Sequence, residues 1–495
     1  MKKLLSLSLV FALILSFTAC SGDAGKGPKD TTVSADTTAP KETIVYEEDS
    51  LPKLDFEGTT VSILAADNVK YYGCDVSVEE LTSEPVNDSI YNRELFVEDR
   101  LGVEINTVKI LRDDFMTEAN KHLNSFDDTY QIYSYITYAM SNMVFDNSLI
   151  DLNEVDYLDF QKPWWAQKFI DAATIDGSLY QATGSITTSL HRSLFAVFYN
   201  KAIAEDYSQS VYDFDNLYDI VESGKWTYDK FYQLGSDIYR DLNGNSEVDA
   251  EDFFGIGFRA QIPTDAMYSG FDINILASTS DGWFEIALNT DKFYSALDII
   301  NNTLHSTTGC FSDSSYSNDE FDQKFASGDL LFNVSRLVSV ESIGLRNMTD
   351  DYGILPFPKY DENQSEYYSF AHDQYISFGI PVTNTDPDVS GAVLEALASY
   401  SYRETEPIYL DMALKGKYMS DAQSRKMTDI IIDGFKVDTA WIFSNTLGAG
   451  FAGTFRDIME KGESDYASTY AKLKKNIEIC LKSYKKTFNE MNKNS

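Results

Sequence analysis

The chain has 495 residues, enough for roughly two or three domains of ordinary size. It carries 40 Lys plus Arg against 78 Asp plus Glu, a formal net charge of −38. This balance argues against nucleic acid as a partner, because nucleic-acid binding needs basic patches. Its four cysteines form no CxxC pair, which excludes a disulfide-stapled scaffold and a zinc ribbon.

The first residues have the pattern of an export signal. Lys2 and Lys3 precede an apolar run over 4–17, which predicts a signal peptide at 1–19. The small residues before Cys20 are typical of a bacterial lipobox, in which the cysteine thiol takes a diacylglycerol. Phe17 departs from the usual leucine, so an ordinary signal peptide with a chance cysteine remains an alternative. We expect lipidation at Cys20 and a location on the extracellular face of the cell membrane, with the lipid as the only membrane contact.

Residues 20–52 are rich in Thr, Ser, Asp, Lys, Gly and Pro and almost devoid of apolar side chains. Such a stretch cannot bury enough surface to offset its ordering entropy. We therefore interpret 20–52 as a flexible tether between the lipid and the folded part.

Beyond the tether, hydrophobic periodicity predicts alternating strands and helices. Such alternation is typical of an α/β fold with a mainly parallel sheet. In chain order, the pattern predicts a strand at 59–65, a helix at 89–101 stopped by Gly102, a strand at 103–110, a helix at 115–123, strands at 130–136, 194–198, 328–334, 350–355 and 374–380, and a mostly helical region over 389–491.

Several segments between 89 and 433 together resemble a known family. They include KPWW at 162–165, DGSLYQATG at 176–184, FAVFYNKAIAEDY at 195–207, DLNGNSEVDAEDFFGIGF at 241–258, ASGDLLFNVSRL at 326–337, DDYGILPFPKYDENQ at 350–364 and LKGKYMSDAQSRKM at 414–427. Their order and spacing resemble the bacterial extracellular solute-binding proteins (family 1, sugar-type) of ABC importers, many of which are lipoproteins.

The resemblance implies a two-lobed periplasmic-binding-protein-like α/β fold of type II, with lobes joined by a three-segment hinge. Crossings between the lobes are expected near 191–200, 328–335 and 372–381. The implied boundaries are 53–190 and 330–380 for the first lobe, and 191–329 and 381–495 for the second. Hinge closure of this kind would couple ligand binding to a shape that an importer recognises.

The sharpest local motif is a twelve-residue acidic loop at 241–252. Its oxygen-bearing side chains have the spacing of a calcium loop, since calcium prefers about six to eight hard oxygen ligands. Ser246 stands where glycine usually makes the turn, and Asp252 replaces the usual glutamate. The alternative is a solvated acidic turn. We expect a structural Ca²⁺ here, with Asp241, Asn243, Asn245, Glu247, Asp249 and Asp252 as ligands.

The resemblance also suggests where a solute would bind. In such proteins, cleft residues come from loops at strand ends and from the hinge. Sugars pack their C–H faces on aromatic rings and hydrogen-bond through their hydroxyls. The residues so placed here are Asp67, Tyr138, Arg192, Gln261, Tyr268, Arg336 and Trp441.

The chain has no HExxH, GxSxG, P-loop or GxGxxG motif and only four histidines. We therefore expect no enzyme. The leading hypothesis is a monomeric, lipid-anchored solute-binding protein that captures a mono- or oligosaccharide and delivers it to ABC permease subunits. The alternatives are a cell-surface polysaccharide hydrolase and a surface adhesion protein.

Overall fold

The computed structural model describes residues 46–67, 75–208, 216–414 and 422–491. Within these ranges, one sheet has the strand order β12-β3-β1-β2. β1 (Thr59–Asp67) pairs in parallel with β2 (Val103–Leu111) and with β3 (Ile132–Ile136), whereas β12 (Ile376–Gly379) runs antiparallel to β3. We call this the first sheet. It contains the first three predicted strands and the last one.

The entry into β2 shows how the sequence sets a boundary. Helix α1 (Pro85–Leu101) ends at Gly102, which has φ 63° and ψ 44° and donates its N–H to the carbonyl of Glu98. Glycine adopts this left-handed conformation without steric cost. The chain therefore turns directly from α1 into β2, as the sequence predicts.

A second sheet has the order β11-β4-β10-β6-β5, with β9 paired to β6. β4 is antiparallel to β10 and β11, whereas β6 is parallel to β10 and β9. Both sheets are thus mixed, although the alternation of elements predicted a mainly parallel one. The strands of the second sheet are β4 (Phe195–Asn200), β5 (Tyr239–Arg240), β6 (Phe253–Gly257), β9 (Cys310–Phe311), β10 (Leu330–Arg336) and β11 (Tyr352–Leu355).

Two connections between the sheets lie side by side. One leads into β4 and the other leads from β11 to β12. The N–H of Phe195 donates to the carbonyl of Phe370 at 2.9 Å, and the N–H of His372 donates to the carbonyl of Ser193 at 3.0 Å. We call residues 193–195 and 370–373 the crossing segments. Their places agree with the crossings expected near 191–200 and 372–381.

The crossing expected near 328–335 is wrong. β10 occupies this range and lies inside the second sheet, between β4 and β6. β11 pairs with β4 in the same sheet. The assignment of 330–380 to the first lobe is therefore incorrect for these two strands, because a hydrophobic strand flanked by turns does not reveal which sheet it joins.

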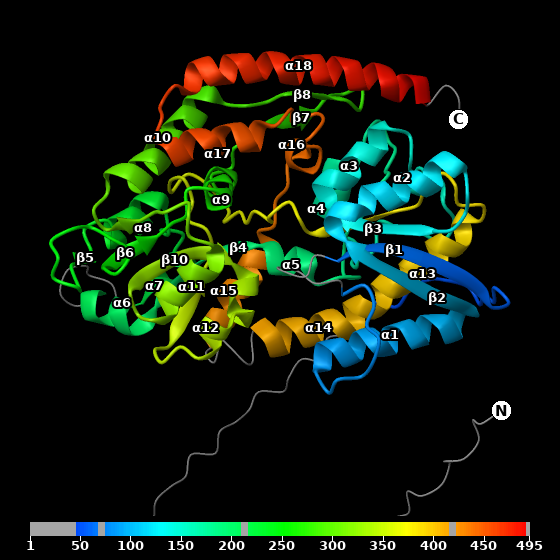
Figure 1. Cartoon of the computed structure of the whole chain (residues 1–495), viewed down its shortest axis with the longest axis horizontal. Helices are drawn as coiled ribbons and strands as arrows, with labels where there is room; N and C mark the ends of the chain where they lie inside the picture. Colours follow the sequence, from blue (N-terminus) through cyan, green and yellow to red (C-terminus); the bar gives the residue numbers. More distant parts are fainter. Residues whose placement is uncertain (1–45, 68–74, 209–215, 415–421, 492–495) are drawn as a thin grey trace, which may run out of the picture. The chain divides into compact units, whose positions relative to one another are not determined.

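A further correction concerns the start of the C-terminal region. Helix α13 (Pro387–Tyr400) packs against α1, beside the first sheet (Figure 1). The Trp165 indole N–H donates to the carboxylate of Glu395 on α13 at 3.0 Å. Helix α15 (Ala422–Asp433) instead packs on β11. The third connection thus runs from α13 to α15, and α13 was wrongly expected in the second lobe.

The other elements cover the sheets and connect them. Trp226 is fully buried just before α8 (Tyr228–Gly235). The remaining elements are a hairpin of β7 (Leu276–Ser278) and β8 (Phe284–Ile286), and the helices α2 (Phe115–Ser125), α3 (Thr137–Phe145), α4 (Gln167–Ala173), α5 (Ser189–Ser193), α6 (Lys201–Ser208), α7 (Leu217–Glu222), α8 (Tyr228–Gly235), α9 (Ile262–Gly270), α10 (Thr290–Ser306), α11 (Asn318–Ala326), α12 (Ile343–Arg346), α14 (Glu406–Ile408), α16 (Thr439–Ile442), α17 (Phe451–Lys461) and α18 (Tyr466–Met491), with short 3₁₀ turns at Arg112–Asp114, Leu152–Glu154 and Leu337–Glu341 and π-helical turns at Ser401–Thr405 and Tyr409–Leu414.

The N-terminal signal segment, Cys20 and most of the predicted tether lie outside the described residues. The last part of the tether does pack on the folded chain. Asp49 forms an ion pair with Arg100, and the ring of Tyr46 meets that of Tyr402 at 5.4 Å. Residues 46–52 therefore belong to the folded part rather than to the tether. Within the described ranges, no helix combines the length and apolarity needed to cross a membrane.

The buried carboxylate of Glu395 gives a pH-dependent prediction. Burial raises its pKa to about 7. Between about pH 4.5 and 7, the Glu395 carboxyl group keeps its proton in the folded chain but releases it in the unfolded chain. Its contribution to the free energy of unfolding therefore falls as the pH rises through this range. Glu395→Gln should raise the melting temperature at pH 8 relative to the unsubstituted chain and change it little at pH 4.5. Thermal unfolding at both pH values measures this. An equal shift of the melting temperature at both pH values would contradict the raised pKa of Glu395.

Candidate functional site

The carboxyl-terminal edge of the first sheet carries two predicted site residues. Asp67 is the last residue of β1, and Tyr138 follows β3 as the second residue of α3. Because β1 and β3 are parallel and Ala65 pairs with Ser134, Asp67 is level with Ile136. The two side chains therefore belong to the same edge. Both are half-buried.

The second sheet places two further predicted residues at one edge. Arg336 ends β10, and Gln261 follows β6 and caps the start of α9. β6 and β10 are parallel, and Asn333 pairs with Gly257. The chain beyond β6 therefore leaves the sheet at the same edge at which β10 ends in Arg336. In open α/β sheets, ligands bind beyond the carboxyl ends of the strands.

The crossing segments join these two edges. Arg336 is level with Phe195, the first residue of β4. The backbone N–H of Thr137 donates to the carbonyl of Tyr375, just after the other crossing segment. His372 and Asp373 therefore lie between the edge that carries Tyr138 and the edge that carries Arg336. We call these four residues, together with Asp67 and Gln261, the strand-end cluster.

The central contact of the cluster joins Arg336 to His372. The guanidinium Nη1 lies 3.1 Å from His372 Nδ1. Arginine has no acceptor, so Nδ1 must accept and carries no proton. Burial lowers the pKa of His372 well below its usual value, and the charge of Arg336 acts in the same direction. His372 is therefore a neutral imidazole at physiological pH.

Burial and a nearby positive charge have opposite effects on the pKa of Asp373. Burial raises the pKa of this carboxyl group, and the positive charge of Arg456 on α17 opposes the rise. The Arg456 Nε donates to Asp265 on α9, whose side chain is fully buried. Burial raises the pKa of Tyr138, with the negative charge of Asp373 as the next cause. The cluster thus extends to Arg456 and Asp265, which the sequence did not single out.

Trp441 reaches this region through an aromatic contact. Its ring meets that of Phe370, in the crossing segment, edge to face at 4.9 Å. Only 4% of Trp441 is exposed. It supports the crossing segment in this structure, and its role as a platform for a sugar stays a prediction.

Arg192 lies on α5, directly before the crossing segment at Ser193, but its side chain forms ion pairs. Its Nε donates to Glu341 at 2.9 Å, and Nη1 lies 3.9 Å from Asp75. The guanidinium also sits 5.3 Å from the centre of the Tyr409 ring. A direct contact with a solute stays a prediction for this residue. Tyr268 lies in α9, and its side chain is outside the described part of the chain.

The strand-end cluster can do two things chemically. Arg336, Arg456, Gln261 and the Tyr138 hydroxyl offer hydrogen-bond donors, and the carboxylates of Asp67 and Asp373 offer acceptors. Such a mixture suits a polar solute with many hydroxyl groups. The sequence missed Asp265, His372, Asp373 and Arg456 because strand ends alone mark only the residues adjacent to them. The position of α17 depends on contacts between segments far apart in the chain.

The acidic loop at 241–252 is well ordered by its own side chains. Asp241 accepts from the N–H groups of Gly244 at 2.6 Å and Ser246 at 2.9 Å. Ser246 has φ 63°, the left-handed conformation that glycine usually supplies at this place in a calcium loop. Asn245 donates to Asp249 at 2.7 Å, so these side chains lie close together.

Asp252, the last predicted calcium ligand, accepts hydrogen bonds from protein groups. Asp252 is fully buried and accepts from the Tyr239 hydroxyl at 2.8 Å and the Leu242 N–H at 3.1 Å. Glu247 lies exposed in the loop, and its carbonyl accepts from the same hydroxyl at 3.3 Å. Among the described residues, no three His, Cys, Asp or Glu side chains are grouped closely enough to hold a metal ion. Calcium binding at Asp241, Asn243, Asn245 and Asp249 stays a prediction.

Solved structures similar to this chain are sugar-binding proteins. A cyclo/maltodextrin-binding protein complexed with maltotetraose has a TM-score of 0.57 at 10% identity, covering 88% of this chain and 98% of the other. The sugar-binding MalE of Xanthomonas citri has a TM-score of 0.57 at 12% identity, covering 87% and 99%. The GacH receptor of Streptomyces glaucescens, solved unliganded and with acarbose, has a TM-score of 0.53 at 13% identity, covering 86% and 99%.

No protein-family model matches the sequence, and no curated protein matches it. The structural likeness nevertheless covers nearly the whole of each neighbour. The chain therefore has the two-lobed α/β fold of periplasmic binding proteins, with one mixed sheet in each lobe. This confirms the predicted fold class. These neighbours are binding proteins rather than enzymes, in accord with the expectation of no catalysis.

The ion pair of Arg192 gives a prediction about stability. Arg192→Ala would leave the Glu341 carboxylate without its 2.9 Å partner in a partly buried place. Loss of a hydrogen bond to a charged group costs about 2 kcal/mol. We expect a lower free energy of unfolding by that amount in urea denaturation. Arg425→Ala, on the exposed surface of α15, is the control and should change little. Equal stability of both variants would show that the Arg192 ion pair is not structural.

Proposed function

We propose that this chain is the solute-binding component of an ABC importer and captures a neutral oligosaccharide of the maltodextrin type at the strand-end cluster. The observation that carries the proposal is the convergence of Asp67, Tyr138, Gln261 and Arg336 on strand ends joined by the crossing segments. Three structural neighbours of the same fold were solved with maltotetraose, maltotriose or acarbose.

The mechanism rests on the two crossing segments. A solute that contacts both strand-end edges stabilises the arrangement in which the edges lie close together. Hydroxyl groups of the sugar would accept from Arg336 and donate to the carboxylates of Asp67 and Asp373. No bond in the solute is made or broken. Permease subunits would recognise the closed arrangement and receive the sugar.

The remaining parts of the proposal concern location. We propose a lipid on Cys20 and a tether up to about residue 45, which would hold the monomeric chain on the extracellular face of the membrane. The lipobox-type sequence and the tether composition support this. The net charge of −38 keeps such a chain solvated.

Sugar binding can be measured by titration calorimetry with maltotriose. Asp67→Ala should weaken binding about tenfold, because a hydrogen bond to a charged group is lost. Glu104→Ala, on the exposed side of β2, is the matched control and should bind normally. Affinity should change little between low and high salt, since the sugar carries no charge.

Two results would contradict the proposal. Release of new reducing ends from maltodextrin would favour a polysaccharide hydrolase. The absence of any heat or thermal stabilisation with maltotriose, maltotetraose and acarbose would exclude this class of solute.

We further propose that the loop at 241–252 binds Ca²⁺ as a structural ion. The support is the left-handed Ser246 and the clustering of Asp241, Asn243, Asn245 and Asp249. A bound cation would offset the repulsion among the carboxylates and hold the loop before β6. Chelation should lower the melting temperature, and Asp241→Ala should remove this response without altering sugar affinity. Identical melting curves with and without chelator would show a solvated acidic turn.

A further inference from the structure

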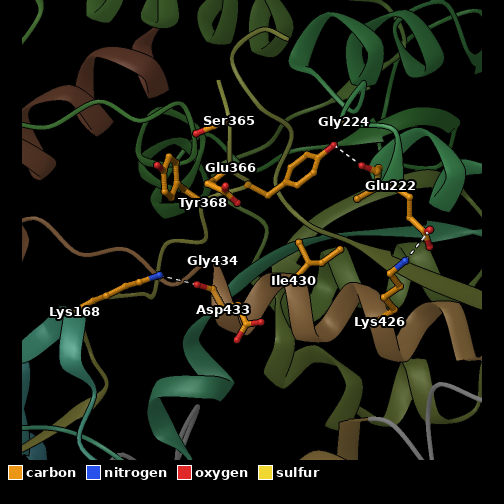
Figure 2. A pocket seen from close by; sticks show the side chains of 12 residues that line it. Lys168, Glu222, Gly224, Ser365, Glu366, Tyr368, Lys426, Ile430, Asp433 and Gly434 are labelled. Atoms are coloured by element: carbon orange, nitrogen blue, oxygen red, sulfur yellow. Dashed lines mark hydrogen bonds and ion pairs between the residues drawn. The ribbon is translucent and has the colours of Figure 1, made fainter. Parts of the chain in front are cut away.

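A cavity of about 580 Å³ lies beside α15 (Figure 2). Its volume is within the range of about 300–1,000 Å³ that is typical of small-molecule sites. Helices α4, α7 and α15 and the segment 365–368 form its walls. It shares no residue with the strand-end cluster. The lining residues are Lys168, Val221, Glu222, Gly224, Ser365, Glu366, Tyr367, Tyr368, Lys426, Ile430, Asp433 and Gly434.

Several side chains of the wall are held in place by the protein. Lys168 Nζ donates to the carbonyl of Asp433 at 2.7 Å, and Lys426 forms a 2.7 Å ion pair with Glu222. The hydroxyl of Tyr367 donates to the carbonyl of Val221 at 2.9 Å. Figure 2 shows the contacts of Lys168 with Asp433 and of Lys426 with Glu222. A ligand that binds here need not order these groups, which favours affinity.

The chemistry of the lining indicates the class of ligand. Tyr368 offers an aromatic ring; the Lys436 ammonium lies 4.6 Å from its centre on one face, and the C–H face of a sugar can pack on the other. Glu366 is exposed, and its carboxylate and the Ser365 hydroxyl can accept hydrogen bonds from ligand hydroxyls. Lys426 is paired with Glu222, and Lys168 donates to the carbonyl of Asp433. The carboxylates of Glu222, Glu366 and Asp433 outnumber these two lysines in the lining, which disfavours an anionic ligand.

We propose that this cavity is a second saccharide site, which takes a neutral mono- or disaccharide unit independently of the strand-end cluster. The inference rests on the proposed function in that it assumes a chain that meets sugars. It does not depend on the strand-end cluster being the first site. The aromatic side chain of Tyr368 and the carboxylate of Glu366 are its principal contacts.

The test is titration calorimetry with maltotriose as the probe, carried to millimolar concentration. The unsubstituted chain should show two binding events. Tyr368→Ala should remove the second event, or weaken it at least tenfold, and leave the first unchanged. Glu366→Ala changes an exposed side chain, so it tests the same site without endangering the fold. Tyr91→Ala, a partly exposed tyrosine on α1, is the matched control and should keep both events.

The outcomes separate the second site from the proposed function. A single event that is weakened about tenfold by Asp67→Ala and unchanged in both Tyr368→Ala and Glu366→Ala overturns the second site and leaves the proposed function intact. A single event that is weakened by Glu366→Ala and unchanged by Asp67→Ala supports the cavity and contradicts the strand-end cluster. Absence of all binding overturns both.

Discussion

The fold depends on the antiparallel contact between the two crossing segments. The backbone N–H groups of Phe195 and His372 donate to the carbonyls of Phe370 and Ser193, respectively. These hydrogen bonds hold the two crossing segments side by side. Because each crossing continues into a strand of a different sheet, this contact fixes which strand ends face each other. Together with the third connection from α13 to α15, this contact brings the polar residues at or after the ends of β1, β3, β6 and β10 to the same region.

Electrostatics at the crossing supports a binding role. His372 accepts from Arg336 and stays neutral, while the positive charge of Arg456 opposes the rise that burial causes in the pKa of Asp373. Polar groups lose hydrogen bonds to water when they are covered, and this costs free energy unless other hydrogen bonds replace them. A polyhydroxylated solute at the strand-end cluster would offer such hydrogen bonds in place of water. The Arg192 ion pairs stiffen the same region without needing to touch the solute.

Local features of the sequence predicted the elements well, because short-range physics sets them. The β-branched run at 59–65, the stop at Gly102 and the helix before it are all present as predicted. The assignment of strands to lobes failed for β10 and α13, since burial on both faces leaves no mark of the partner strand or helix. Strand-end reasoning selected Asp67, Tyr138, Gln261 and Arg336, which lie at or after strand ends; their contact with a solute stays a prediction. It missed Arg456 and Asp265, which meet only through tertiary packing of α17 on α9.

The central claim is that a sugar binds where the strand ends of both lobes face each other. Hydrogen–deuterium exchange with and without maltotriose tests this most directly. The account predicts slower exchange in peptides that cover 134–140, 258–265 and 370–375, on both sheet edges and the crossing between them. Slower exchange confined to one lobe, or absent from 370–375, would contradict it.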